Sequence, residues 1–146
     1  AYLAGLLRNL GKIILNNHPG ARQYPGEAAA PDLFAWEKSV YGTSSPEATA
    51  MLLDHWRFPL EIAGAICTHA TPVTAAEFTA GAATLHLAGA IATDWGCALP
   101  GETGLWRRDA AMCALAGVEE EMLEGAATDA RKQFGRFATL EWSQAA

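Results

Sequence analysis

Near its start the chain reads Leu6-Leu7-Arg8-Asn9-Leu10-Gly11-Lys12, and this stretch decides the fold that the sequence predicts. The apolar residues around it recur at the spacing of one face of an α-helix: Leu3, Leu6, Leu7, Leu10 and Ile14. At about 100° per residue, Arg8 and Asn9 lie roughly opposite this apolar stripe. The pattern therefore predicts one amphipathic helix from residue 2 to Asn16, with two polar side chains on its other side.

The position of Arg8 and Asn9 allows two interpretations. They form a solvent-facing side of the helix, or they line a polar pocket between this helix and the helices that carry His69 and His86. In a pocket Arg8 would suit a small anionic ligand, because its guanidinium fork binds carboxylates and phosphates in a bidentate manner. The sequence leaves both interpretations open.

Helical signals continue through the middle of the chain. A short helix is predicted over residues 32–40, and the capping-box spacing of Ser44 and Glu47 predicts the start of the next helix. Pro59 begins a further helix, with His69 on its inner, apolar side. The helix after Ser44 is expected to present Met51 and Trp56 to the core, and three tryptophans are expected to be core residues: Trp36, Trp56 and Trp95.

The second half of the chain is also predicted to be helical. A long helix is expected from Thr74 to about Leu99, followed by a loop and two helices over 105–116 and 119–142. No segment alternates with period two for long enough to indicate a strand. The sequence thus predicts a single all-α domain over 1–146, a compact bundle of about six to seven helices.

The charge and cysteine content of the chain exclude or disfavour several classes of function. The formal net charge is −6, and no Lys or Arg occurs between Arg57 and Arg107, which argues against a nucleic-acid partner. The three cysteines are widely spaced, so neither a zinc site nor a disulfide framework is indicated, and a cytoplasmic location is expected. The low-charge stretch 78–99 is rich in Ala, Gly and Thr and contains His86, which favours a buried helix over a membrane span.

With the helices placed, the chain resembles the HDOD family, the HD-related output domain of bacterial signalling proteins within the HD/PDEase-like superfamily. The resemblance covers residues 1–99 best and the C-terminal helices at 105–142 weakly. It depends on the order and spacing of several short matches: Ala4-Gly5-Leu6-Leu7, Leu10-Gly11-Lys12, Glu37, Tyr41-Gly42, Leu52-Leu53, Trp56, Pro59, Ile62, Ala65-Ile66, His69 and Leu85-His86-Leu87-Ala88. Because the first predicted helix begins without a capping residue, we expect a further helical half of the domain upstream.

The resemblance also implies where a metal would be held in metal-dependent members of the wider superfamily. A His-Asp pair would stand at Arg8 and Asn9, a histidine at Ser45, two adjacent histidines at His69 and Ala70, and a carboxylate at Gly89. Arginine has no lone pair to donate to a metal, and asparagine offers only a neutral oxygen. Of the positions listed, only His69 therefore still carries a side chain that binds metals well. A catalytic metal needs about three protein ligands. The resemblance therefore implies a degenerate metal site, with no catalytic residue, metal or cofactor.

Other matched residues have simpler interpretations. His69 is expected to be a hydrogen-bonded core histidine rather than a ligand, and His86 a packing residue close to Gly89. Lys12 and Glu37 are expected to form an ion pair or a helix cap. The residues of the vestigial pocket, and of any anion site within it, are Arg8, Asn9, Ser45, His69 and His86.

We therefore expect a non-catalytic signalling or regulatory domain that contacts a partner protein or a neighbouring signalling domain. Two alternatives stay open. One is a residual metal-dependent HD-type phosphohydrolase whose missing ligands come from elsewhere. The other is a structural dimerisation module, a homodimer in which the 78–99 helix or the C-terminal helix pairs with its twin.

Overall fold

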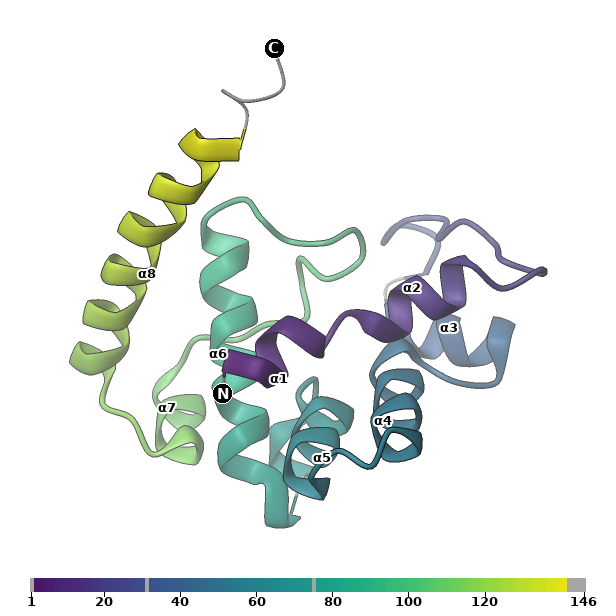
Figure 1. Ribbon diagram of the computed structural model, residues 1–146, viewed down its shortest axis with the longest axis horizontal. Coiled ribbons are helices and arrows are strands. Elements are labelled where there is room, and N and C mark those ends of the chain that lie inside the picture. The colour runs from purple at the N-terminus through teal and green to yellow at the C-terminus, as the bar shows by residue number, and fades with distance from the viewer. Residues whose placement is uncertain (1, 31, 75, 142–146) are drawn as a thin grey trace.

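The computed structural model describes residues 2–30, 32–74 and 76–141, and these residues contain helices but no strand (Figure 1). The elements are α1 (Tyr2–Leu7), α2 (Leu10–Asn16), α3 (Leu33–Tyr41), α4 (Ser45–His55), α5 (Leu60–Thr68), the short 3₁₀ turns η1 (Pro72–Thr74) and η2 (Ala76–Phe78), α6 (Thr79–Asp94), α7 (Ala110–Ala116) and α8 (Glu120–Glu141). The predicted all-α helical bundle is confirmed.

Successive helices pack against one another in a chain of contacts. Helix α2 packs on α4, α4 on α5, α5 on α6 and α6 on α7, while α1 crosses α5 and α6 (Figure 1). The main core lies between α4, α5 and α6, where Leu53 and Ile66 are fully buried. A smaller apolar cluster joins Leu87 of α6 to Met112 and Cys113 of α7. Within the described part of the chain, no helix combines the length and apolar character needed to cross a membrane.

The first predicted helix is broken at Arg8–Asn9, which corrects the expectation of one continuous helix. The amide of Gly11 donates to Thr49 Oγ1 of α4 at 2.7 Å instead of continuing the helical ladder, and Thr49 Oγ1 lies 3.3 Å from the carbonyl oxygen of Arg8. A contact with α4 thus replaces the hydrogen bonds that a straight helix would make. As a result the apolar stripe is not buried along its length: Leu6 is 66% exposed.

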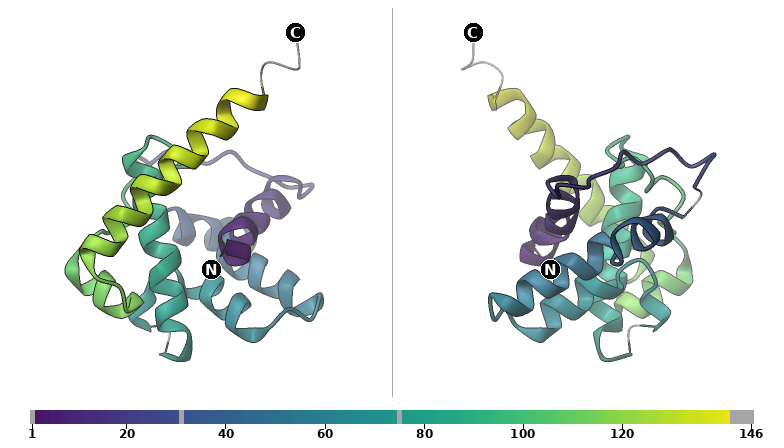
Figure 2. Two further views of the ribbon diagram at one scale, coloured as in Figure 1. Left: turned by 60° about the vertical axis from the view of Figure 1, so that its left-hand side comes forward. Right: turned by 90° about the vertical axis from the view of Figure 1, so that its right-hand side faces the viewer.

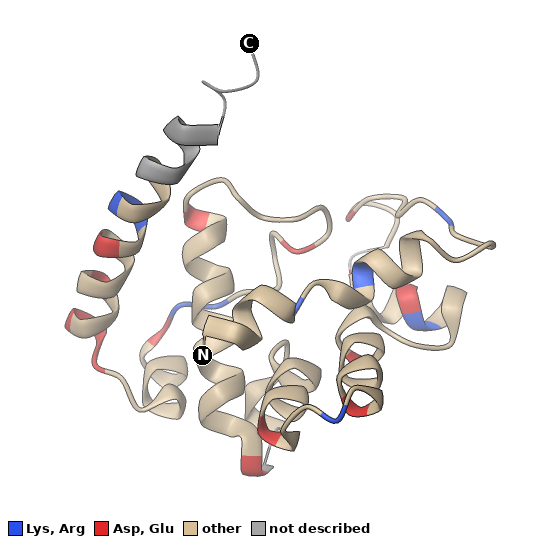
Figure 3. Cartoon of the chain, in the orientation of Figure 1, with Lys and Arg blue, Asp and Glu red and all other residues tan. Residues whose placement is uncertain are grey.

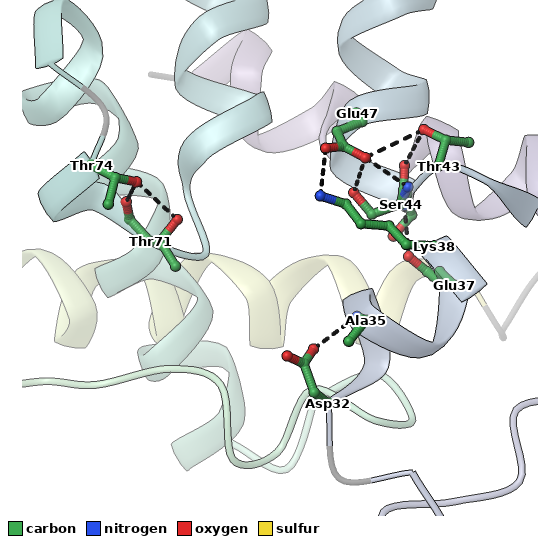
Figure 4. Close-up of polar contacts among 10 residues, drawn as sticks. Asp32, Ala35, Glu37, Lys38, Thr43, Ser44, Glu47, Thr71 and Thr74 are labelled. Atoms are coloured by element: carbon green, nitrogen blue, oxygen red, sulfur yellow. Dashed lines mark hydrogen bonds and ion pairs between the residues drawn. The ribbon is translucent and has the colours of Figure 1, made fainter. Parts of the chain in front are cut away.

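Helices α2 and α4 approach closely because Gly11 has no side chain. A Cβ atom placed on Gly11 would lie 1.9 Å from the carbonyl oxygen of Ser45, a distance that no packed side chain tolerates. The capping box predicted at the start of α4 is confirmed, since the amide of Ser44 donates to the Glu47 carboxylate at 2.9 Å (Figure 4). Lys38 of α3 binds the same carboxylate at 2.7 Å.

Several predicted boundaries and core positions differ in the structure. Helix α4 ends at His55, and the chain then turns through Arg57, whose φ of 58° is left-handed, so Trp56 remains 52% exposed. Met51 of α4 is likewise exposed rather than buried, and Trp36 and Trp95 are only partly buried. Helix α6 begins at Thr79 and ends at Asp94, and α7 begins at Ala110, where Asp109 accepts the amide hydrogen of Met112. The predicted end of the last helix at residue 142 lies outside the described residues.

Candidate functional site

The loop between α6 and α7, residues 95–109, returns to the centre of the molecule and buries Trp106. The indole lies against Gly89 of α6, where an added Cβ would approach the ring to 2.8–3.1 Å. The indole therefore packs directly on the backbone of Gly89, and a larger residue at this position would displace Trp106. The side chains around this ring, Arg8, His69, His86 and Glu102, together with Trp106 itself, form what we term the Trp106 cluster.

Both histidines of the cluster pack on the indole in fixed tautomers. His69, at the C-terminal end of α5, stacks on Trp106 at 5.2 Å between ring centroids, and His86 of α6 meets the ring edge-on at 5.3 Å. His69 Nδ1 donates to the carbonyl oxygen of Ile66 at 2.6 Å, and His86 Nδ1 donates to that of His69 at 2.9 Å. His86 Nε2 accepts the amide hydrogen of Arg107 at 2.8 Å, so both nitrogens of His86 are occupied.

Burial keeps these imidazoles neutral. Desolvation lowers the pKa of His69 from 6.5 to about 4, and the positive charge of Arg8 acts in the same direction. The pKa of His86 is also lowered, again mainly by burial. The two histidines therefore serve as uncharged packing groups at neutral pH, and only Nε2 of His69 keeps a lone pair that no protein donor uses.

A buried ion-pair triad joins the cluster to the first two helices. Glu102, 2% exposed, lies 2.7 Å from Lys12 Nζ and 3.5 Å from Arg8 Nη2. The Arg8 guanidinium also lies over the face of Trp106, 5.3 Å from the ring centroid, a cation–π contact. Arg8 Nη1 is buried and has no hydrogen-bond partner. The break after α1 thus turns Arg8 inward, onto a carboxylate supplied by a distant loop.

A second buried carboxylate holds the start of α4. Glu37 of α3 accepts the amide hydrogen of Ser45 at 2.6 Å, capping the first turn of α4. Burial raises the pKa of Glu37, and the bond from the Ser45 amide opposes that rise. An ion pair or a cap was the role expected for Lys12 and Glu37: Lys12 forms an ion pair with Glu102, and Glu37 caps α4.

The structure brings together only part of the predicted pocket. Arg8, His69 and His86 meet around Trp106, whereas Ser45 lies at the Gly11 contact between α2 and α4 and Asn9 faces a neighbouring cavity. Ala70 lines a separate depression near Lys38. The two residues that complete the site, Glu102 and Trp106, lie in a loop without periodicity, and no motif in the sequence marks them.

This donor set does not fit a catalytic metal. Among the described residues, no group of three or more His, Cys, Asp or Glu side chains is arranged to hold an ion. The chemistry of the side chains gives the reason, because Glu102 is neutralised by two cations and His86 has no free nitrogen.

The fold and the Trp106 cluster define a helical-bundle domain. Its buried polar side chains form ion pairs and hydrogen bonds with one another and with the backbone. In a comparison with protein families, residues 1–72, just under half of the chain, match the model of the HDOD domain, which confirms the resemblance over that range. Searches of curated proteins and of solved structures found no match. Arg8 and His69 lie inside the matched range, whereas His86, Glu102 and Trp106 lie beyond it.

The triad makes a testable contribution to stability. Replacing the carboxylate in Glu102→Gln leaves two partly buried cations without a counter-ion, and we expect the free energy of unfolding in urea to fall by about 2–4 kcal/mol. Glu124→Gln is the matched control, because Glu124 is 59% exposed and pairs with Arg108 at the surface, where the loss should be within about 0.5 kcal/mol. Equal, small losses in both variants would show that the triad is energetically unimportant.

The lowered pKa of His69 predicts a loss of stability in mild acid. The unfolded chain binds a proton at His69 near pH 6.5 but the folded chain only near pH 4, so this contribution is complete above pH 6.5 and declines as the pH falls toward 4. Between pH 7 and pH 5 it should cost about 2 kcal/mol of unfolding free energy. Urea titrations at both pH values should show a smaller pH effect in His69→Gln by that amount. An NMR titration midpoint for His69 near 6.5 would contradict the prediction.

Proposed function

We propose that this chain is a non-catalytic regulatory domain that acts through contacts with a partner protein or with a neighbouring domain. The observation that supports this proposal is the buried triad of Arg8, Lys12 and Glu102 beside Trp106. At positions where the resemblance implies metal ligands, the chain carries an arginine already held by its own carboxylate. Ion pairs buried between the loop at 95–109 and the first two helices hold these elements in a fixed arrangement. A fixed arrangement of helices can present a defined surface to a partner protein.

The surface of the first helices supports a role in binding a protein. Several large apolar side chains are exposed on neighbouring elements: Leu3 and Leu6 on α1, Ile13 and Ile14 on α2, Met51 on α4, and Leu60 on α5. Large apolar side chains exposed on neighbouring helices are a feature of many interaction sites. Charged side chains are sparse along α1, α5 and α6 (Figure 3), so recognition there would depend on apolar contact rather than on charge.

The small anionic ligand expected at Arg8 is not part of this proposal. Glu102 already lies beside the guanidinium, and Trp106 covers one of its faces. A ligand at Arg8 would have to displace a carboxylate that is itself buried, at the cost of leaving that charge unpaired.

The non-catalytic part of the proposal is tested by metal content and turnover. Purified protein, incubated with manganese, iron or zinc and then desalted, should retain no stoichiometric metal by emission spectroscopy and should not hydrolyse a panel of phosphodiesters and nucleotides. Stoichiometric metal with turnover abolished in His69→Ala, but retained in His55→Ala on the exposed end of α4, would instead establish a residual phosphohydrolase.

The proposed contact with a partner or a neighbouring domain is tested by introducing a charged side chain among the exposed apolar residues. In the natural full-length protein, Leu6→Glu should weaken partner or interdomain cross-links at least tenfold, because burying an unpaired carboxylate costs more than 1.4 kcal/mol. Met122→Glu is the matched control, since Met122 is equally exposed but lies on α8. Unchanged cross-links in Leu6→Glu, with an unchanged urea midpoint, would remove this surface from the proposal.

A further inference from the structure

A cavity of about 380 Å³ lies next to the Trp106 cluster, and the proposed function makes no use of it. It is lined by residues of α2 and α3, by Arg22 and Tyr24 between these helices, and by Leu99 and Pro100 of the loop at 95–109. Its volume falls within the range of about 300–1,000 Å³ that is usual for small-molecule sites. Lys12 belongs to both places, because it lines the cavity and binds Glu102.

One wall of the cavity is aromatic and is held in place by hydrogen bonds. Trp36 meets Tyr24 edge-to-face at 5.4 Å and Tyr41 at 6.0 Å, so three rings form a continuous surface. The amide of Arg22 donates to Tyr41 Oη at 2.8 Å, and that hydroxyl lies 3.1 Å from the Arg22 carbonyl oxygen. Tyr24 Oη donates to the carbonyl oxygen of Ala30. A wall of fixed rings suits a planar ligand.

The charged lining of the cavity is mainly positive. Arg22 and Lys12 both line it, and Arg22 forms no ion pair within the part of the chain that the structure describes. Its guanidinium is therefore available to a carboxylate or a phosphate, which it can bind through two parallel hydrogen bonds. Lys12 uses its ammonium group on Glu102 but keeps further N–H donors.

The floor of the cavity offers acceptors for a hydrogen-bond donor. Glu37 accepts the Ser45 amide hydrogen through Oε2, and the nearby Ser45 side chain also opposes the rise that burial causes in its pKa, yet the carboxylate keeps acceptor sites for a further donor. The side chain of Asn9 also lines the cavity and does not cap α2. A ligand ring that carries an N–H group could donate to either oxygen without disturbing the cap of α4.

We propose that this cavity binds a small anion built on a planar ring with an N–H donor. The ring lies against Trp36, its N–H donates to Glu37 or Asn9, and its anionic group binds Arg22 with support from Lys12. The proposal can be tested separately from the partner contacts proposed above, because its test uses the isolated chain; of the exposed apolar side chains named there, Ile13 also lines this cavity.

The test uses indole-3-acetate as the probe, because it combines a planar ring, an N–H and a carboxylate. Titration followed by calorimetry and by amide NMR shifts should give a dissociation constant of about 1 mM or tighter, as expected for a ligand of this size. Indole-3-acetamide, which has the same shape without the charge, and acetate, which lacks the ring, should each bind at least about tenfold more weakly.

Two variants place the binding in the cavity. Arg22→Gln, on an exposed loop, should weaken indole-3-acetate about tenfold, and Trp36→Leu should weaken it further, whereas Arg131→Gln and Trp56→Leu should leave it unchanged. Arg22→Gln keeps the test decisive even if Trp36→Leu unfolds. The proposal is overturned if the probe fails to bind, if the acetamide binds equally well, or if Arg22→Gln has no effect.

Discussion

Glu102 is a carboxylate that water hardly reaches, and two cations from the start of the chain stabilise it there. Removing a carboxylate from water costs several kcal/mol, so the arrangement persists only while Arg8 and Lys12 stay beside it. Because Glu102 and Arg8 are 94 residues apart, this single charge ties the loop at 95–109 to the junction of α1 and α2. The position of Trp106, and through it the packing of both buried histidines, depends on that tie.

The same interaction forms part of a polar centre in which most groups are paired within the chain. Most of the groups that could coordinate an ion already have protein partners: Glu102 pairs with two cations, one oxygen of Glu37 accepts an amide hydrogen, and both nitrogens of His86 bond to backbone groups. A guanidinium over an indole contributes positive charge without an open coordination position.

Local signals in the sequence predicted the helices well. The capping box of Ser44 and Glu47, and the absence of period-two alternation, were sufficient for the all-α bundle because both act within a few residues. The break at Arg8 was not predictable in this way, since it depends on Thr49 accepting the amide hydrogen of Gly11 from another helix. Glu102 and Trp106 were missed for the same reason: their burial is decided by partners far along the chain. The exposure of Trp56 follows from the turn at Arg57, which periodicity does not report.

Helix α8 has a mechanical consequence. From Thr128 to Gly135 every residue is exposed, and the C-terminal part of the helix projects beyond the other elements (Figure 2). Its first turns are held by Leu123 and Ala127, by the ion pair of Glu124 with Arg108, and by the turn at Gly117, whose φ is 69°. At 1.5 Å of rise per residue, the part beyond Ala127 extends roughly 20 Å, so a tilt of about 10° at the anchor displaces its far end by roughly 3–4 Å. By geometry alone, a change in the direction of α8 near α7 is therefore amplified along the length of the helix.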